Sequence, residues 1–516
     1  SEMCIRDRGN IEYLTENEIS IRLRATQQNP SVLPAESLYA IEHDTMDTTF
    51  RSMYQGLYIY LSARKERRDL LLSQRPPRFD ESLDSMISRS EDDFTRIALK
   101  AKAAQDYFLL IGPPGTGKTS CALKKMVETF HADKDAQILL LSYTNRAVDE
   151  ICKSLASIAP AVDFIRVGSE LSCDEAYRGH LIENELSSCN RRSEVYERIR
   201  NCRIIVGTVA AISGKPELFR LKHFDVAIID EATQILEPQL LGILCARGED
   251  GKDAIDKFVL IGDHKQLPAV VQQNTEQSAI YDESLLSIGL TNLKDSLFER
   301  LYRNCTATVH RSYDMLCRQG RMHPEVALFA NRAFYGGRLI PVGLPHQIES
   351  SDTICRLAFY PSVPEKAGAS AKINYSEARI VADLAVRIYE DHQTDFDESR
   401  TLGIITPYRS QIALIKKEIE SLGIPALNRI LVDTVERFQG SERDVIIYSF
   451  CVNYPYQLKF LSNLTEEEGV LIDRKLNVAL TRARKQMFIT GVPELLERNP
   501  LYKSLLKLIE SLRNIA

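Results

Sequence analysis

The chain has 516 residues, 44% of them hydrophobic and 26% charged, the composition of an ordinary folded protein of two to four domains. Its net charge of −6 gives no overall basic character, so any nucleic-acid surface must be a local groove. No apolar run approaches the roughly 20 residues of a membrane span, and we expect neither a membrane-embedded chain nor a membrane partner.

The 11 cysteines are scattered and include no C-x-x-C pair. This spacing argues against a zinc ribbon and gives no support for an iron–sulfur cluster. Cys121, Cys152, Cys245 and Cys451 stand in apolar surroundings. We therefore expect buried, reduced thiols in a cytoplasmic protein.

The start of the chain indicates an accessory region. The chain begins with Ser1, and its first nine residues resemble adaptor read-through, so we leave them out of the fold reasoning and expect a fragment of a longer protein. Residues 19–24 alternate apolar and basic side chains, as a strand does. Apolar side chains at helical spacing predict one long amphipathic helix over about residues 50–75, followed by a polar linker over 78–93.

A phosphate-binding loop follows. Residues 107–111 form an apolar run as long as a buried strand, and residues 112–119 fit the pattern G-x-x-x-x-G-K-[ST]. Glycines there let backbone N–H groups turn towards phosphates. Lys118 supplies a mobile positive charge, and the Thr119 hydroxyl is a ligand for Mg²⁺. The apolar spacing over 123–130 predicts a helix that begins at the phosphates. The residues expected to bind a nucleoside triphosphate are Gly112, Pro113, Pro114, Gly115, Thr116, Gly117, Lys118, Thr119 and Ser120.

Short apolar runs then recur, each with a polar loop at its C-terminal end. They are residues 138–141, 204–206, 226–229, 258–261, 403–405, 445–450 and 487–489. Segments with helical spacing separate several of these runs, and a stretch rich in Arg and Glu over 171–203 predicts a helical insertion. Short strands that alternate with helices predict parallel α/β sheets, in which ligands lie beyond the carboxyl ends of the strands.

Two of these strand ends carry side chains suited to hydrolysis. Asp230 and Glu231 close one apolar run. In a P-loop enzyme a carboxylate at this place holds Mg²⁺, and a second one can orient and deprotonate the attacking water. Gln266, after the next run, can hydrogen-bond a γ-phosphate and report its loss. The alternative for these positions is a solvated loop, or a turn built by Gly262 and Pro268.

With these three motifs in order, the chain resembles the superfamily 1 helicases. GPPGTGKT, DEAT and GDHKQLPAV are similar to motifs I, II and III of that superfamily. The segments that resemble its other motifs are residues 142–149, 207–209, 320–325, 406–411, 433–442 and 477–484. Their wording is most similar to superfamily 1B, which moves 5′→3′ on a single strand. The branch that it resembles includes the nonsense-mediated-decay RNA helicase and the nuclease-helicase that processes Okazaki fragments.

The resemblance implies an α/β fold of two tandem RecA-like P-loop NTPase domains with a small strand-and-helix accessory region. We place the accessory region, a partial barrel with stalk helices, at residues 1–94. The first RecA-like domain is expected at 95–303 and the second, with the arginine fingers, at 304–516.

The resemblance also implies residue roles. Arg321 and Arg482 are expected to be arginine fingers, which supply positive charge as the γ-phosphate gains negative charge. The implied catalytic residues are Lys118, Asp230, Glu231, Gln266, Arg321 and Arg482, with Thr119 and Asp230 on Mg²⁺. Further ATP contacts are implied for Gln439, Gly440 and Glu442. Nucleic-acid contacts are expected at Thr144, Asn145, Thr208, Pro407, Tyr408 and Thr434. For these contacts a helix-capping or turn role is the alternative.

Two departures from the family concern adenine. Relatives usually carry an aromatic residue before the first arginine finger, where it stacks on adenine, and here that residue is Gly320. The upstream glutamine that reads adenine in many relatives is not evident in residues 91–104. We therefore expect loose recognition of the base, so that other nucleoside triphosphates are accepted.

We expect an ATP-dependent 5′→3′ DNA helicase or translocase that uses ATP and Mg²⁺ and moves on single-stranded DNA. An RNA helicase or ribonucleoprotein remodeller of the same branch remains an alternative, because a preference for or against the 2′-OH cannot be read from these motifs. A slow P-loop switch and a non-catalytic nucleic-acid scaffold are further rivals, against which the second RecA-like half and the intact catalytic residues argue. Several relatives carry a nuclease ahead of the motor, and we expect that such a domain or partner stood upstream of this fragment. The oligomeric state stays open.

Overall fold

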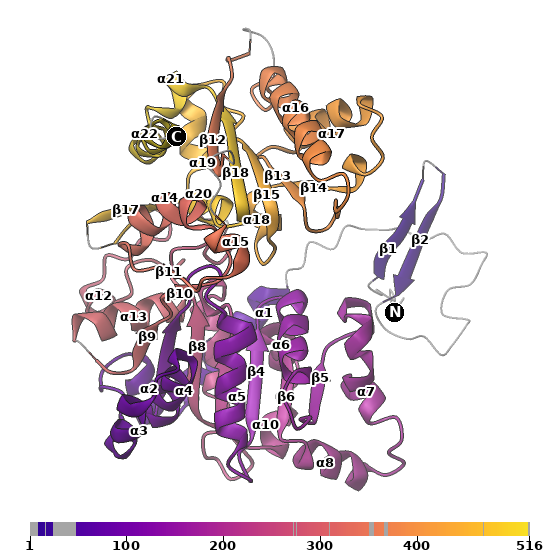
Figure 1. The fold of residues 1–516 in the computed structure, drawn as a ribbon. Coiled ribbons are helices and arrows are strands. Elements are labelled where there is room, and N and C mark those ends of the chain that lie inside the picture. The colour runs from indigo at the N-terminus through magenta and orange to yellow at the C-terminus, as the bar shows by residue number, and fades with distance from the viewer. Residues whose placement is uncertain are drawn as a thin grey trace, which may run out of the picture.

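The structure, a computed structural model, describes residues 9–15, 17–23, 48–271, 273–274, 276–308, 310–349, 355–365, 370–467 and 469–513. Its main feature is a pair of lobes, each a parallel sheet flanked by helices, drawn one above the other in Figure 1. This arrangement confirms the predicted α/β fold of two tandem RecA-like domains. Within the described ranges, none of the helices combines the length and the apolar content needed to cross a lipid bilayer.

The first lobe is built on a seven-stranded sheet in the order β5-β6-β4-β7-β8-β3-β9, and every pairing in it is parallel. Its strands are β3 (Tyr107–Ile111), β4 (Ile138–Ser142), β5 (Phe164–Val167), β6 (Ile204–Thr208), β7 (Phe224–Ile229), β8 (Ile255–Gly262) and β9 (Tyr313–Met315). The five apolar runs expected here are confirmed as strands. The two edge strands β5 and β9 were not predicted.

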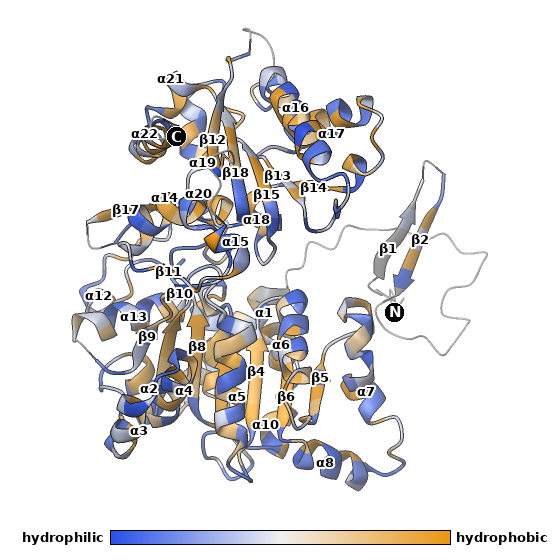
Figure 2. Cartoon of the chain, in the orientation of Figure 1, coloured by the Kyte–Doolittle hydropathy of each residue, from blue (hydrophilic) through white to orange (hydrophobic). Residues whose placement is uncertain are grey.

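Helices cover both faces of this sheet. They are α4 (Asp93–Ala103), α5 (Lys124–His131), α6 (Asn145–Ala156), α7 (Ile182–Glu185), α8 (Arg192–Asn201), α9 (Val209–Ser213), α10 (Glu217–Leu221), α11 (Glu237–Leu244), α12 (Glu283–Ser287) and α13 (Leu297–Ala307). The helical insertion expected over 171–203 contains α7 and α8. Alternate residues of each strand pack into two separate cores, one on each face, so the strands read as continuous apolar runs. Figure 2 shows this concentration of apolar residues in the strands.

The second lobe is built on a five-stranded parallel sheet in the order β12-β18-β15-β13-β14. Its strands are β12 (Leu357–Pro361), β13 (Leu402–Ile405), β14 (Leu431–Asp433), β15 (Arg443–Ser449) and β18 (Ala483–Gly491). The three apolar runs predicted here, 403–405, 445–450 and 487–489, lie in β13, β15 and β18. Again the two faces carry separate apolar cores.

Helices and two small ribbons complete the second lobe. The helices are α14 (Pro324–Tyr335), α15 (Pro345–Ile348), α16 (Tyr375–Asp391), α17 (Arg409–Ser421), α18 (Val435–Phe438), α19 (Leu458–Leu461), α20 (Arg474–Leu480), α21 (Pro493–Leu496) and α22 (Pro500–Arg513). The ribbons are the antiparallel hairpin β16 (Leu464–Glu467) and β17 (Val470–Asp473) and the short parallel pair β10 (Arg318–Gln319) and β11 (Ile340–Pro341).

The boundary between the lobes lies later than predicted. We expected it at residue 303, but β9 pairs with β3 and so belongs to the first sheet. Helix α14, which begins at Pro324, packs on β18 and α20 of the second lobe. The chain therefore adds one edge strand to the first sheet before it crosses, and it crosses between residues 315 and 324.

The accessory region differs from its prediction in two places. The antiparallel hairpin of β1 (Gly9–Leu14) and β2 (Ile19–Leu23) contains the predicted strand; residues 24–47 of the region expected to hold a partial barrel lie outside the described residues. The single helix expected over 50–75 is two helices, α1 (Thr48–Ser62) and α2 (Lys65–Leu71). They are separated at Arg64, whose backbone is extended, with ψ 146°. The break turns α2 so that the buried Arg67 guanidinium donates to the Ile255 carbonyl at 2.5 Å.

The linker predicted over 78–93 is structured. Asp80 accepts a hydrogen bond from the Ser82 backbone N–H at 2.9 Å, which starts a 3₁₀ turn, and helix α3 (Asp84–Arg89) follows. The Asp92 side chain then caps α4 by accepting from the Thr95 N–H at 2.8 Å. Two of the acidic side chains that made this stretch look like a linker, Asp80 and Asp92, are therefore helix caps.

Helix α1 rests on the first lobe through two glycines. Gly56 lies against Gly242 of α11, and a Cβ at Gly56 would stand 2.3 Å from the Pro238 carbonyl oxygen. The two helices consequently meet backbone to backbone. On the other side of α1, large side chains face outward, at Phe50, Tyr54, Leu57, Tyr58 and Leu61.

The expectation of buried thiols is confirmed for Cys152, Cys245 and Cys451 and wrong for Cys121. Cys121 is exposed because the turn after the phosphate-binding loop is π-helical over Lys118–Leu123. The wider turn places Ala122 and Leu123, rather than Cys121, in the core.

Candidate functional site

The phosphate-binding loop lies at the carboxyl end of β3, as the sequence predicted. Gly115 and Gly117 have φ values of 75° and 76°, a backbone conformation that favours glycine. A Cβ at Gly112 would stand 2.0 Å from Cγ of Lys118, so glycine leaves the room through which the lysine passes. Thr116 closes the loop by donating to the Pro113 carbonyl at 2.7 Å. Pro113 and Pro114 are buried and Ser120 is exposed.

Two carboxylates stand opposite this loop, at the end of β7. Asp230 is buried and accepts a hydrogen bond from the Thr119 hydroxyl at 2.5 Å. Burial and the neighbouring charge of Glu231 raise the pKa of Asp230 to about 6. The Oε1 atom of Glu231 is 3.6 Å from Lys118 Nζ, while its Oε2 accepts from Gln234 at 2.8 Å. Glu231 has a φ of 53°, an uncommon conformation for a residue with a side chain.

The donor set fits a nucleotide with Mg²⁺. One hydroxyl and one carboxylate oxygen meet within hydrogen-bonding distance at Thr119 and Asp230, and oxygen atoms are the ligands that Mg²⁺ prefers. Glycine backbone in left-handed conformations lines the loop beside them, which is the form of an anion-binding cradle. The structure therefore brings the phosphate loop and the predicted metal ligands to one place.

Gln266 is held in a buried polar network that crosses from the first lobe to the second. It donates to Asp263 at 2.8 Å, and the Tyr335 hydroxyl donates to the same carboxylate at 2.7 Å. Asn477 of α20 then donates to the Tyr335 oxygen at 2.8 Å. Sequence reasoning gave no role to Asp263, Tyr335 or Asn477, although Asp263 lies in GDHKQLPAV and Asn477 begins the motif-like segment 477–484.

Arg321 reaches the phosphate-binding loop from the segment between the lobes. The Gly320 N–H donates to the Gly115 carbonyl at 2.8 Å. A Cβ added to Gly115 would stand 2.4 Å from Cβ of Arg321. The Arg321 guanidinium donates through Nε to Glu442 at 2.5 Å. Burial would raise the pKa of Glu442, but the positive charge of Arg321 outweighs it and lowers that pKa.

Arg482 enters the same cleft from the second lobe. It is only 2% exposed and donates to the Val478 carbonyl at 3.1 Å and to Gln266 Oε1 at 3.3 Å. Burial, and then the nearby charge of Arg321, lower the pKa of Arg482 to about 9. The bond to Gln266 joins the two lobes directly at the predicted catalytic residues.

The remaining ATP contacts implied by the resemblance lie on the loop before β15. Gly440 accepts a hydrogen bond from Arg146 of the first lobe at 3.2 Å through its carbonyl. Glu442 lies within ion-pairing distance of Arg321, at 2.5 Å, and of Arg484, at 3.7 Å. Gln439 ends α18 and is half-buried. This loop therefore lies beside the cleft, and its Glu442 carboxylate is ion-paired with Arg321 and Arg484.

In the first lobe, the predicted nucleic-acid contacts lie side by side at the strand ends. Ser142 and Thr208 are paired neighbours at the ends of β4 and β6. Thr144 caps α6 by accepting from Ala147 N at 3.2 Å, and Thr208 caps α9 by accepting from Ala211 N at 3.1 Å. Asn145 is the first residue of α6. The capping role that we considered as an alternative is thus present for both threonines.

In the second lobe, the predicted contacts follow β13 and β14, which are paired neighbours at Ile405 and Asp433. Pro407 and Tyr408 follow β13, and Thr434 precedes α18. The Tyr408 hydroxyl accepts a hydrogen bond from Gln457 at 3.1 Å. Both lobes therefore present their candidate contacts at the carboxyl ends of adjacent strands.

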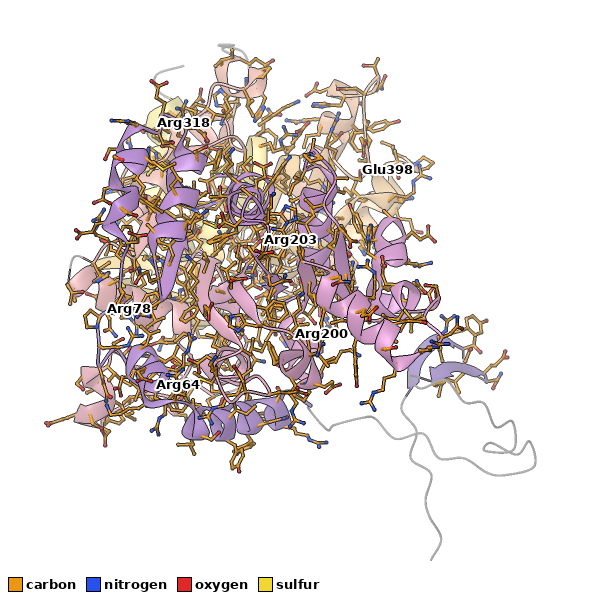
Figure 3. The ribbon with its side chains drawn as sticks, turned by 90° about the horizontal axis from the view of Figure 1, so that it is seen from below. Arg64, Arg78, Arg200, Arg203, Arg318 and Glu398 are labelled. Atoms are coloured by element: carbon orange, nitrogen blue, oxygen red, sulfur yellow. The ribbon has the colours of Figure 1, made fainter. Side chains whose placement is uncertain are left out.

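The opposite, amino edge of the first sheet carries a cavity of about 1210 Å³. Arg64 and Arg78, two of its lining residues, are labelled in the view from below in Figure 3. Arg75 and Arg78 both bind Asp106, at 2.8 and 2.9 Å. Burial would raise the pKa of Asp106, but these two arginines hold it well below its ordinary value. They thus fix the segment after α2 to the sheet.

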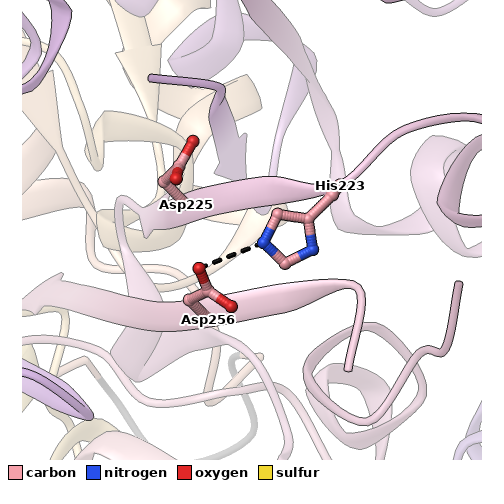
Figure 4. A group of neighbouring side chains, drawn as sticks. All are labelled: His223, Asp225 and Asp256. Carbon is pink, nitrogen blue, oxygen red and sulfur yellow. Dashed lines mark ion pairs between the residues drawn. The ribbon is translucent and has the colours of Figure 1, made fainter. Parts of the chain in front are cut away.

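His223, Asp225 and Asp256 also gather at this edge (Figure 4). His223 Nε2 lies 3.0 Å from an Asp256 carboxylate oxygen, and this hydrogen bond raises the pKa of His223. Asp225 accepts from the Gln137 N–H at 2.6 Å. Each member has a protein partner, and the group lies at the end of the sheet away from the phosphate-binding loop.

Comparison with known proteins agrees with this geometry. Two family models, both described as AAA domain, match the chain, one over residues 89–195 and 182–274 and the other over 293–494. The first falls on the lobe with the phosphate-binding loop. The second starts at the last helix of that lobe and covers most of the lobe with Arg482.

Curated relatives match nearly the whole chain. The DNA replication ATP-dependent helicase/nuclease DNA2 of Gallus gallus is 28% identical over 96% of this chain and 47% of its own length. The protein of the same name from Homo sapiens gives the same three figures. The DNA polymerase alpha-associated DNA helicase A of Saccharomyces cerevisiae is 24% identical over 95% of this chain and 79% of its own length. The chain spans about half the length of the first two relatives. Both lobes thus match AAA-domain models, and over most of its length the chain is similar to proteins named as ATP-dependent helicases.

Proposed function

We propose that this chain is an ATP-dependent 5′→3′ DNA helicase or translocase, in which ATP hydrolysis between the lobes drives movement along single-stranded DNA. The observation that carries the proposal is the hydrogen bond from Arg482 to Gln266 at 3.3 Å. It connects a guanidinium of the second lobe to a side chain that follows β8, the neighbour of β3 in the first sheet. Hydrolysis of one bound nucleotide can therefore change the relative position of the two lobes.

In this proposal each cleft residue has one task. Lys118 and the loop glycines would hold the phosphates of ATP, and Thr119 and Asp230 would hold Mg²⁺, which would supply positive charge to the phosphates when bound. Glu231 orients and deprotonates the attacking water. The raised pKa of Asp230 and the 3.6 Å approach of Lys118 to Glu231 support a cleft in which these groups are electrostatically coupled.

The two arginines would stabilise the transferring phosphoryl group. Arg482 is held by carbonyl oxygens and by Gln266, so little rearrangement is needed when negative charge develops nearby. Arg321 is bound to Glu442 at 2.5 Å. To act as an arginine finger, Arg321 must exchange the Glu442 carboxylate for a phosphate oxygen. We therefore assign Glu442 the role of positioning Arg321 until ATP binds.

Single-stranded DNA would lie over the carboxyl ends of β4, β6, β13 and β14, and the names of the relatives favour DNA over RNA. Contacts there would come from the N-termini of α6 and α9, whose first N–H groups suit backbone phosphates. Thr144 and Thr208 would act mainly through the helix ends that they cap. Tyr408 and Thr434 would complete the path on the second lobe. We place this activity in the cytoplasm, which the free thiols of the described cysteines support.

The test measures ATP hydrolysis with no nucleic acid, with single-stranded DNA and with RNA of the same sequence. Lys118→Ala and Arg482→Ala run alongside, with Arg332→Ala, an exposed arginine on α14, as the matched control. Stimulation by DNA that both cleft variants abolish and the control retains is the expected result. Stimulation by RNA alone would move the chain to the RNA helicases and remodellers. Turnover indifferent to both would leave a P-loop switch.

Direction is tested separately by strand displacement. Partial duplexes with a 5′ or a 3′ single-stranded tail are mixed with the protein and ATP. Displacement that requires the 5′ tail supports 5′→3′ movement, whereas displacement that requires the 3′ tail contradicts it.

A further inference from the structure

An exposed aromatic cluster lies beyond the carboxyl end of β15, outside every motif that the resemblance assigned. The rings of Tyr454 and Tyr456 are stacked, with centroids 5.7 Å apart and planes 14° from parallel. Tyr456 is 55% exposed and Phe460, on α19, is 69% exposed. Large exposed rings grouped in this way are typical of binding surfaces.

The cluster is attached to a rigid frame. Gln457, 2% exposed, accepts through Oε1 from the N–H groups of Asn453 and Tyr454, both at 2.9 Å. Its Nε2 donates to the Ala371 carbonyl at 2.8 Å. Directly after it, Leu458 and Leu461 of α19 are buried in the core of the second lobe. The rings are therefore presented by backbone that is fixed on both sides, which limits the entropy lost on binding.

The same frame connects the cluster to a proposed nucleic-acid contact. Gln457 Nε2 also donates to the Tyr408 hydroxyl at 3.1 Å. One buried side chain thus positions both the residue after β13 and the loop after β15, and these two strands are adjacent in the sheet. The cluster therefore lies beside Tyr408 at the carboxyl edge of the second sheet.

The same short segment also carries a basic residue. Lys459 is exposed and makes no ion pair with the described residues of the chain. It lies three residues after Tyr456 and next to Phe460, so all three project from one outward side of the short helical segment. Aromatic rings interleaved with a free ammonium group suit a polymer of flat bases joined by phosphates.

We propose that Tyr454, Tyr456, Phe460 and Lys459 form a base-stacking platform that binds single-stranded nucleic acid beyond Tyr408. This inference rests on the proposed function and adds a contact site to it. Stacking accepts every base, so the platform would grip the strand without reading its sequence. The occupant is single-stranded nucleic acid, and self-association is an outcome that the test separates from it.

The experiment uses the full chain and fluorescently labelled single-stranded DNA of mixed sequence, with an abasic strand of equal length and charge. The variants are Tyr456→Ala/Phe460→Ala and the conservative Tyr456→Phe. Tyr281→Ala, at an 81% exposed tyrosine of the first lobe, is the matched control. The thermal unfolding midpoint is measured for each, so that a folding defect is recognised.

For the double variant we expect the Kd for normal DNA to rise roughly tenfold or more, as loss of base stacking predicts. On the abasic strand the difference between wild type and double variant is expected to vanish, because the phosphates remain and the bases do not. Tyr456→Phe and Tyr281→Ala should bind as wild type does. These results together would establish stacking.

Other outcomes overturn the platform. An unchanged Kd for the double variant, with DNA binding by the wild type intact, removes the platform and leaves the helicase proposal standing. A loss of affinity that is equal on normal and abasic strands shows that the rings do not stack on bases. A wild type that sediments as a dimer and a variant that sediments as a monomer, with equal Kd, assign the cluster to self-association. A wild type that neither binds DNA nor responds to it refutes the proposed function itself.

Discussion

Replacing Glu231 by glutamine tests the central chemical assignment. The change keeps the size of the side chain and its ability to accept the hydrogen bond that Gln234 now donates at 2.8 Å. It removes the negative charge 3.6 Å from Lys118 Nζ, a charge worth about 4 to 5 kcal/mol to the lysine at an effective dielectric constant of about 20. Lys118 loses a competitor for the phosphates, so ATP binding should be kept or strengthened.

The expected effect is therefore confined to turnover. Loss of a positioned general base lowers kcat by about 10²- to 10⁴-fold, or about 3 to 5 kcal/mol of transition-state stabilisation. KM for ATP should stay within about threefold or fall, because the interaction that is lost acts in the transition state. Glu231 already has a φ of 53°, and glutamine shares that backbone cost, so a change in the unfolding midpoint would report the lost charge and not backbone strain.

The assay is steady-state ATP hydrolysis with saturating single-stranded DNA, accompanied by equilibrium binding of a fluorescent ATP analogue. Glu128→Gln, on α5 and paired only with Lys125 at 3.5 Å, is the control and should behave as wild type. A kcat within fivefold of wild type would refute the role of Glu231 as base. A large rise in KM at unchanged kcat would show that Glu231 serves binding instead.

Three further outcomes follow from the structure. Burial alone would raise the pKa of Glu467, but His264 and Lys265 together outweigh it and lower that pKa to about 2. Glu467→Gln should therefore lower the unfolding free energy by about 1 to 2 kcal/mol above pH 4.5. Urea titrations should show this difference disappearing as the pH falls towards 2. Gly56→Ala should cost about 1 to 3 kcal/mol in the same assay, because its Cβ would clash 2.3 Å from a carbonyl oxygen. Gly214→Ala, at an ordinary φ of −76° and with its nearest contact at an ordinary 3.5 Å, should be neutral within about 0.5 kcal/mol. With Gly320 in place of an aromatic residue, stacking worth about 1 to 3 kcal/mol is missing, so GTP turnover should come within about tenfold of ATP turnover; a preference for ATP above about a hundredfold would contradict this.

Much of the architecture was predictable because the informative signals were local. A buried parallel strand is a short apolar run, and β3, β4, β7 and β8 were found on that basis. Edge strands give weaker signals: β9 has only three residues and includes Asp314, so the lobe boundary was placed too early. The break at Arg64 was not predictable from spacing, since it depends on a carbonyl of β8 that lies about 190 residues away in sequence.

The residues of the cleft also differ in whether local sequence could predict them. Motif residues could be assigned because each stands at a strand end with a characteristic spacing. Their partners could not, because the network from Gln266 through Asp263 and Tyr335 to Asn477 joins three segments far apart in the chain. The pairing of His264 with Glu467 likewise depends on how the hairpin of the second lobe folds towards the first.

The glycine contact between α1 and α11 has a mechanical consequence. Backbone meets backbone at Gly56 and Gly242, and no side chain lies between them to absorb displacement. Helix α11 begins at Glu237, six residues after Glu231, so a movement of the catalytic loop passes through α11 to α1. Gly56 lies about 12 Å along the helix axis from the start of α1 at Thr48, so a tilt of about 5° about this contact would move that end by about 1 Å. We therefore expect α1 to move together with α11 whenever the loop that carries Asp230 and Glu231 moves.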